Sequence, residues 1–190
     1  MDTELSQIER AITFAVHAHA GSFRRDGHTP YILHCTETAD ITANMTDDPD
    51  VITAAVLHDI LEDTDTPEAT LTDAFGARVA GLVKAMSENK RSPLPPESTW
   101  LIRKEETITA IEQSHDDDFR RICLADKLSN LRGISRDYRK YGDDIWDNFH
   151  QKSRKKQGWY YFRLESALSS LSDTEAWKEF HQLRIFVFGQ

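Results

Sequence analysis

Imidazole and carboxylate side chains recur in this chain in a pattern that suits metal chemistry. The candidate ligands are His34, His58, Asp59 and Asp126. Two imidazoles and two carboxylates form a ligand set that suits a hard-to-borderline divalent ion such as Mn2+. We therefore predict a site for one manganese ion per chain.

A second acidic pair follows the His-Asp pair at helical spacing. Residues four apart share one face of a helix. On a helix, Glu62 therefore stands one turn beyond His58, and Asp63 stands one turn beyond Asp59. This spacing puts two carboxylates beside the predicted metal, where a water molecule or a phosphate has room.

The simplest alternative for an isolated His-Asp pair is structural. The apolar run 54–57 directly before His58 indicates burial, and a buried aspartate needs a partner because an unpaired charge is costly away from water. A hydrogen-bonded His-Asp pair that holds helices together meets that need. The combination with His34, the second acidic pair and Asp126 favours the metal site over this alternative.

Composition and charge limit the classes of partner that the chain can bind. The 190 residues carry a net charge of -9, which argues against generic binding to nucleic acid, because such binding requires a broad positive surface. An anionic small substrate is compatible with this charge if a local basic cluster receives it. The candidates for that cluster are Arg24, Arg25, Lys104, Lys127 and Arg132.

The sequence carries no signal for a membrane or for secretion. No apolar stretch approaches the roughly 20 residues that span a bilayer. Residues 1–5 lack the basic and then apolar pattern of a signal peptide. Two cysteines, Cys35 and Cys123, do not make a disulfide framework in a chain of this length. We expect a cytoplasmic protein with reduced thiols.

Helices are the elements expected to position these residues. Apolar residues at helical spacing and prolines at helix starts support this interpretation, with Thr66 as the cap of one helix and Gly76 at its end. Helices are expected at 3–19, 31–45, 50–61, 66–75, 77–86, 100–113, 119–134, 144–156, 158–171 and 174–182. Segments 21–30 and 87–98 are expected loops, and 183–188 is an expected tail. We predict one all-α domain, with the metal core in 17–135 and the helices of 144–190 packed on it.

Several of these segments together resemble a known superfamily. They are 19–34, which ends in Pro-Tyr-Ile-Leu-His, then 57–64, Phe75–Gly76, and 124–130 with its single aspartate. In order and spacing they resemble the HD-domain metal-dependent phosphohydrolases, most of all the hydrolase domain of RelA/SpoT-type alarmone enzymes and their small stand-alone relatives. The resemblance covers about 17–131 and implies an HD-type helical bundle.

The resemblance also implies roles for individual residues. His34, His58, Asp59 and Asp126 match the family's metal ligands, usually for manganese, and Glu62 and Asp63 match its catalytic acidic pair. Arg24, Arg25 and Asn130 match positions that hold the nucleotide, and we add Lys104 as a substrate-binding candidate. The implied reaction removes pyrophosphate from the 3′ position of guanosine tetra- or pentaphosphate and leaves GDP or GTP. The family's synthetase domain has no counterpart in this chain, so the resemblance implies degradation alone.

Some residues depart from the family pattern and leave the substrate open. Cys35 stands where the alarmone enzymes usually carry proline, and Cys123 stands where they often carry lysine. The segment 87–104 and the C-terminal aromatic residues are not close matches. Two other functions therefore stay open. One is an HD phosphohydrolase for another nucleotide or phosphorylated metabolite, adenine alarmones included, and the other is a silent HD module that binds a nucleotide.

Overall fold

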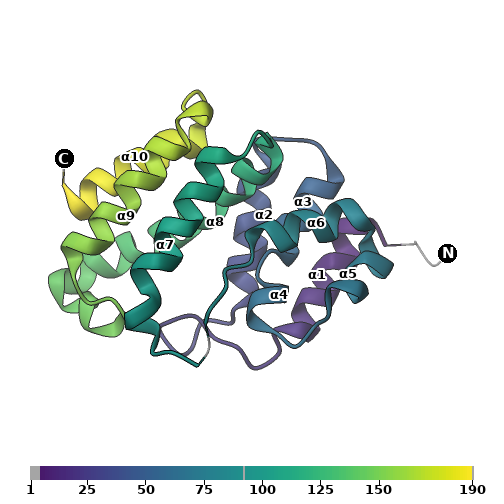
Figure 1. Ribbon diagram of the computed structural model, residues 1–190, viewed down its shortest axis with the longest axis horizontal. Helices are drawn as coiled ribbons and strands as arrows, with labels where there is room; N and C mark the ends of the chain where they lie inside the picture. The colour runs from purple at the N-terminus through teal and green to yellow at the C-terminus, as the bar shows by residue number, and fades with distance from the viewer. Residues whose placement is uncertain (1–4, 92, 190) are drawn as a thin grey trace. The chain divides into compact units, whose positions relative to one another are not determined.

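The described residues of the protein form an all-α structure. The computed structural model describes residues 5–91 and 93–189. Within these ranges the chain forms α-helices and short 3-10 helices, and its β-type pairing is an isolated bridge between Phe23 and Pro30. Figure 1 shows the helices in chain order. The prediction of an all-α fold is confirmed for this part of the chain.

The chain divides into two compact units. Unit 1 comprises residues 1–87 and 121–126, and unit 2 comprises 88–120 and 127–190. Our expectation of one domain, with the helices of 144–190 packed on a core in 17–135, stays a prediction. Every predicted metal ligand and both predicted catalytic acids belong to unit 1.

Unit 1 is built around a short apolar helix. Its helices are α1 (Gln7–Ala18), α2 (Ile32–Ala43), α3 (Pro49–Leu57), α4 (Ile60–Asp63), α5 (Glu68–Phe75) and α6 (Ala77–Met86). Helix α3 packs against α1, α2 and α6. Its start is fixed by Asp48, whose side chain accepts the Asp50 amide, and by Pro49 in the first turn. Ala54 and Ala55 are fully buried, and such small side chains let neighbouring helices approach α3 closely.

Unit 2 contains longer helices and an aromatic cluster. Its elements are α7 (Pro96–Gln113), α8 (Asp117–Tyr141) apart from residues 121–126, η1 (Gly142–Asn148), α9 (Arg154–Ala167), η2 (Ser169–Leu171) and α10 (Glu175–Phe188). Helix α9 packs against α7 and α10. The Trp100 ring on α7 lies 6.0 Å from the Tyr160 ring on α9, centroid to centroid. Aromatic contacts of this kind supply much of the apolar burial in unit 2.

Several expected boundaries were wrong. The helix expected over 50–61 is two helices, because α3 ends at Leu57 and α4 begins at Ile60. The expected tail 183–188 is the last part of α10. Of the helix expected over 144–156, residues 144–148 belong to the 3-10 segment η1 and residues 154–156 begin α9. Pro67, and not Thr66, is the N-cap of α5. The first expected helix begins at Gln7, and residues 3–4 lie outside the described part of the chain.

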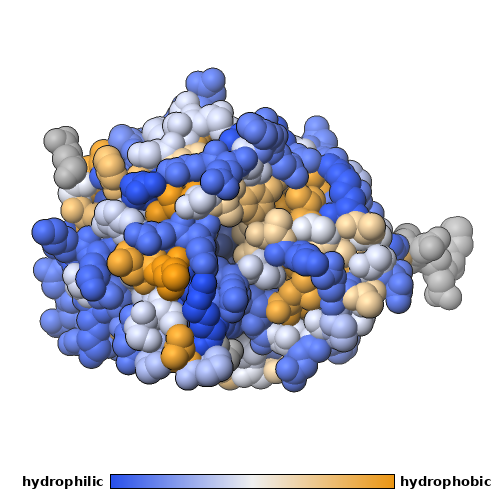
Figure 2. Space-filling model, viewed as in Figure 1, coloured by the Kyte–Doolittle hydropathy of each residue, from blue (hydrophilic) through white to orange (hydrophobic). Residues whose placement is uncertain are grey.

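Most of the surface seen in Figure 2 is hydrophilic. An apolar patch lies over α7, where Leu101 and Ile102 are each 47% exposed. Isolated exposed apolar residues are normal on protein surfaces. None of the described helices has the length and apolarity that crossing a membrane requires.

Candidate functional site

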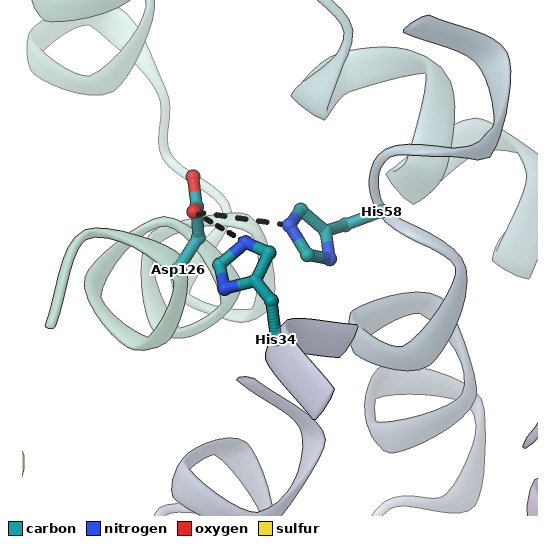
Figure 3. Close-up of side chains that lie close together, drawn as sticks. All are labelled: His34, His58 and Asp126. Carbon is teal, nitrogen blue, oxygen red and sulfur yellow. Dashed lines mark ion pairs between the residues drawn. The ribbon is translucent and has the colours of Figure 1, made fainter. Parts of the chain in front are cut away.

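The four predicted metal ligands lie together in unit 1. His34 stands in the first turn of α2, His58 and Asp59 form the junction between α3 and α4, and Asp126 lies in α8. His34 Nε2 lies 3.3 Å from Asp126 Oδ1 and 3.5 Å from Asp59 Oδ2. His58 Nε2 lies 3.0 Å from Asp59 Oδ2 and 3.8 Å from Asp126 Oδ1. Figure 3 shows His34, His58 and Asp126 pointing toward one another from three separate segments.

The break between α3 and α4 explains how neighbours in sequence reach the same point. On a continuous helix, adjacent side chains point about 100° apart. Here α3 ends before His58, and α4 begins after Asp59. The amides of Glu62 and Asp63 both donate to the Asp59 carbonyl, at 3.2 and 2.8 Å. This turn brings His58 Nε2 and Asp59 Oδ2 together, which the expected continuous helix does not do.

The orientation of His58 fits metal binding. Its Nδ1 donates to the Ala55 carbonyl at 2.8 Å, and its Nε2 faces the carboxylates of Asp59 and Asp126. Nε2 is buried and has no hydrogen-bond partner among the described residues. A buried polar atom without a partner requires an explanation, and a backbone carbonyl on the far nitrogen is the usual way to orient a metal-bound imidazole. The donor set therefore fits a divalent cation.

Electrostatics keep the Asp59 carboxylate ionised. Burial raises the pKa of Asp59, but His58 and His34 beside it hold that pKa well below its usual range. Burial lowers the pKa of His58, whereas Asp59 and Asp126 raise it by more, to about 9. An ionised carboxylate is the form that binds a cation. Of the described residues, His34, His58 and Asp126 have ligand atoms that all lie within 4.8 Å of one another.

Two residues without a predicted role lie against the cluster. Tyr31 donates its hydroxyl to Asp59 Oδ2 at 2.6 Å. The His19 ring packs on the Tyr31 ring with centroids 4.9 Å apart, and burial lowers the pKa of His19. The signal in the sequence was the position of Tyr31, three residues before His34 and thus one helical turn away. A tyrosine has too many ordinary packing roles for spacing alone to identify it.

The loop that carries Arg24 and Arg25 has a defined shape. Asp26 accepts the amides of His28 and Thr29 at 3.0 and 2.8 Å, and Gly27 provides the positive φ of 74° that the turn requires. The Arg24 guanidinium lies 5.9 Å from the centroid of the Tyr31 ring. Arg25 is exposed at the tip of the loop. The loop thus brings Arg24 next to a residue that contacts the cluster.

Both predicted catalytic acids lie in α4. Glu62 is half-buried and Asp63 is exposed. Burial, Asp59 and Asp63 raise the pKa of Tyr31, in that order of size. Both acids therefore follow Asp59 on the next helix, and their catalytic roles stay predictions.

The remaining substrate-binding candidates lie in unit 2. Lys104 on α7 donates to Glu88 at 2.7 Å and lies 5.1 Å from the centroid of the Tyr160 ring. Asn130 is half-buried and follows Asp126 by four residues in α8. Of the wider basic set, Arg132 forms a bidentate pair with Glu179 at 2.7 and 2.6 Å. The substrate roles of Lys104 and Asn130 stay predictions.

Known proteins share both the sequence pattern and the fold. The sequence model of the HD domain family matches residues 11–154, which include all four candidate ligands. The chain is 35% identical over 139 residues to guanosine-3′,5′-bis(diphosphate) 3′-pyrophosphohydrolase MESH1 of Mus musculus, covering 72% of this chain and 74% of that protein. It is also 35% identical over 128 residues to the Aquifex aeolicus enzyme of the same chemical name, but spans 18% of that longer protein.

Two solved structures have similar folds. One is described as a metazoan ortholog of SpoT that hydrolyzes ppGpp; it superposes with a TM-score of 0.75 at 23% identity and covers 96% of both chains. The other is a protein of Listeria monocytogenes, with a TM-score of 0.70 at 27% identity over 83% of this chain and 94% of that one. The all-α arrangement described above thus recurs in both proteins.

Proposed function

Because this chain belongs to the HD domain family, we propose that it is a metal-dependent hydrolase that removes pyrophosphate from the 3′ position of guanosine tetra- and pentaphosphate. The names of the mouse and Aquifex aeolicus relatives support this reaction. The products are GDP or GTP and pyrophosphate. The chain spans three quarters of the mouse relative, so most of a stand-alone enzyme of this kind has a counterpart here.

One observation carries the proposal: the buried His58 Nε2, which has no hydrogen-bond partner among the described residues, faces the carboxylates of Asp59 and Asp126. Here the ring already donates from Nδ1 to the Ala55 carbonyl. The arrangement therefore supports His34, His58, Asp59 and Asp126 as ligands of one cation.

We assign manganese to this site because half of its donors are carboxylate oxygens and half are imidazole nitrogens. A divalent ion held there supplies a bound water of lowered pKa and neutralises phosphate charge. Either Glu62 or Asp63 then accepts the proton of the attacking water at a carboxylate oxygen. We take half-buried Glu62 as the first of the two to test.

The bond changes balance as a hydrolysis. Water attacks the phosphorus that is attached to the 3′ oxygen, and the bond between that phosphorus and the 3′ oxygen breaks. Pyrophosphate leaves, and the 3′ oxygen takes up a proton to become a hydroxyl. No redox partner or second substrate is required.

The residues outside the cluster hold the nucleotide in this proposal. Guanidinium groups stack on purines and bind phosphates, so Arg24 and Arg25 receive the base and its phosphates. Asn130 bonds the ribose, and Lys104 binds phosphate. Stacking by a guanidinium does not distinguish guanine from adenine, so adenine alarmones are a second substrate class to test. Cys35 and Cys123 are both buried and form no disulfide bond, which supports the cytoplasmic location that belongs to the same proposal.

The test is a product assay on metal-stripped protein with guanosine tetraphosphate, with and without manganese, resolving GDP, pyrophosphate and free phosphate. We expect manganese-dependent release of GDP and pyrophosphate in equal amounts. Glu62→Gln should lower kcat by about 100-fold or more and leave manganese binding unchanged. Glu68→Gln makes the same change in an exposed ion pair with Lys84 and should have no effect.

Other outcomes separate the alternatives. Release of free phosphate alone would indicate a phosphomonoesterase, and turnover of only the adenine analogue would change the substrate class. Manganese binding without turnover of any nucleotide would favour the silent binding module. Full activity in Glu62→Gln would remove the role assigned to that residue.

A further inference from the structure

Tyr31 contacts the candidate metal site directly. None of the roles assigned so far explains this contact. We propose that Tyr31 is a positioning residue: its hydroxyl fixes the Asp59 carboxylate and thereby sets the affinity of the site for its metal ion. This inference rests on the proposed metal site and names a residue outside the ligand set that controls it.

The hydroxyl of Tyr31 donates to the one oxygen of Asp59 that faces both imidazoles. Its distance to Asp59 Oδ2 is 2.6 Å, which is typical of a hydroxyl donating to an ionised carboxylate. The same Oδ2 lies 3.0 Å from His58 Nε2 and 3.5 Å from His34 Nε2. The hydrogen bond therefore acts on the oxygen at the centre of the donor set.

The position of Tyr31 at the start of α2 does not by itself explain why the residue is a tyrosine. Tyr31 is the N-cap residue of α2, and its side chain makes no capping hydrogen bond. Serine, threonine, aspartate and asparagine are the residues that stabilise a helix at that position. Tyrosine is thus a poor choice for starting α2, whereas it is long enough to reach Asp59, 28 residues later in the chain.

Neighbouring rings hold the Tyr31 side chain in place. The His34 ring meets it edge to face at 5.5 Å between centroids, and the His19 ring lies 4.9 Å away. The Arg24 guanidinium is 5.9 Å from the Tyr31 ring centroid. Tyr31 therefore contacts two candidate metal ligands and one candidate nucleotide-binding residue. A phenol held in this way loses little further entropy when it orients Asp59.

The hydrogen bond has a direct effect on metal binding. An aspartate carboxylate can turn about its last bond, so binding a metal requires that this rotation be restricted. Tyr31 restricts it before the ion arrives. Hydrogen bonds to metal-binding carboxylates are worth roughly 10- to 100-fold in metal affinity. Loss of the hydroxyl should therefore weaken metal binding, while the donor set itself stays complete.

The experiment compares wild-type protein with Tyr31→Phe, which keeps the ring and removes the hydroxyl. Manganese alone is titrated into metal-stripped protein, and its Kd is measured by calorimetry and by the electron paramagnetic resonance signal of the free ion. We expect the Kd to rise roughly 10- to 100-fold in Tyr31→Phe. The manganese concentration for half-maximal hydrolysis should rise by the same factor, while KM for the nucleotide at saturating manganese stays unchanged.

A matched control and a second readout separate positioning from folding. Tyr138→Phe also removes a phenolic hydroxyl, but in unit 2, where the Tyr138 ring packs on Trp146 and Phe186, and it should leave the Kd unchanged. A purely structural role of Tyr31 would lower the Tm equally with and without manganese. The positioning role predicts that the gain in Tm on adding manganese is itself smaller in Tyr31→Phe.

Each outcome has one meaning. An unchanged Kd in Tyr31→Phe, with wild-type protein binding manganese, would overturn this inference and leave the proposed function in place. Failure of the wild-type protein to bind manganese would overturn the proposed metal site, and with it this inference.

Discussion

At the scale of single residues, Glu88 shows how a buried charge is made stable. Its carboxylate accepts hydrogen bonds from Arg103, Lys104 and Thr107 at 3.0, 2.7 and 2.9 Å. Burial raises the pKa of Glu88, but Lys104 and Lys127 lower it by more, so that it lies below its usual value of 4.5. The ionised form is therefore favoured by folding, and this free energy depends on pH.

Glu88→Gln should destabilise unit 2 at neutral pH by about 3 kcal/mol, because it leaves buried cations without their anion. A carboxylate with a lowered pKa contributes its stability above the pKa of the unfolded chain and loses it as the pH falls through the folded value. The difference in unfolding free energy between variant and wild type should therefore have its full size above pH 5 and become smaller below about pH 4.5. Denaturant unfolding across this pH range measures it.

The control for this prediction is Glu112→Gln, in an exposed pair with Arg163 at 2.9 Å. Exposed pairs of this kind contribute about 0–1 kcal/mol, so its effect should be small at every pH. A difference for Glu88→Gln that stays constant down to pH 3 would contradict the role given to the ionised carboxylate.

Residue types led to the proposed ligands of the candidate site but not to the groups that orient them. His34, His58, Asp59 and Asp126 are uncommon in apolar surroundings, so their burial required a chemical reason that the sequence already indicated. Tyr31 and the Ala55 carbonyl gave no such signal. Tyrosine packs almost anywhere, and a backbone carbonyl is present at every residue. Hydrogen bonds that orient the ligands become visible only in three dimensions.

At the scale of elements, the junction between α3 and α4 was the feature that the sequence concealed. His58 has φ −55° and ψ −32°, and Asp59 has φ −95° and ψ −2°, so both lie near helical conformations. Apolar periodicity continues across them, and neither glycine nor proline marks the break. The helix was therefore expected to continue to Leu61. The break between α3 and α4 is a tertiary effect, which local helix propensity does not predict.

At the C-terminal end of α10, the helix continues where a tail was expected. Residues 183–188 contain five apolar side chains in six positions, so no clear polar face was visible to define a helix. The structure continues α10 to Phe188, with the Thr174 hydroxyl capping its start. Val187 is fully buried, whereas Phe186 is 44% exposed. The helix was missed because its exposed face is itself apolar.

Gly76 was predicted as a helix end, and its conformation explains why. Between α5 and α6 it adopts φ 88° and ψ 161°, a region that is almost restricted to glycine and costs other residues about 1–3 kcal/mol. Gly76→Ala should therefore lower the unfolding free energy by that amount, although open space surrounds an added Cβ. Thermal and denaturant unfolding measure the change.

Gly81 provides the matched control one helix away. It lies inside α6 and is exposed, and an added Cβ there also meets nothing within 4 Å. Gly81→Ala should stabilise the protein by about 0.5–1 kcal/mol, because alanine loses less backbone entropy in a helix. Equal effects of the two substitutions would show that the backbone conformation of Gly76 carries no strain for alanine.

At the scale of the whole molecule, fold class and family were predictable, and the division into units was not. Helical periodicity recurs along most of the chain, and the ordered motifs of 19–130 led to the HD family, which the family match over 11–154 confirms. Unit 1 takes residues 121–126 from the middle of α8. No change in composition marks the unit boundaries at residues 120 and 127, because helix α8 continues through both positions.

Manganese should stabilise the folded chain as a whole. A ligand that binds only the native state adds about 2.7 kcal/mol at a concentration of about 100 times its Kd. For a protein of this size, that corresponds to a rise in Tm of about 5–10 °C. A chelator should reverse the rise, and Asp126→Asn should abolish it, because the buried cluster then lacks one of its carboxylates. An unchanged Tm in wild-type protein at saturating manganese would argue against the assigned site.

The discontinuity of unit 1 has a consequence for how the protein is made. Asp126 follows Asp59 by 67 residues, and translation at about 5–20 residues per second separates their synthesis by roughly 3–13 s. During that interval the nascent chain has His34, His58 and Asp59 but lacks the segment with Ile122, Leu124 and Ala125, all fully buried in the finished fold. A growing chain that ends at Ser87 thus exposes apolar surface that a chaperone can bind, and it acquires its full ligand set only after α8 has been translated.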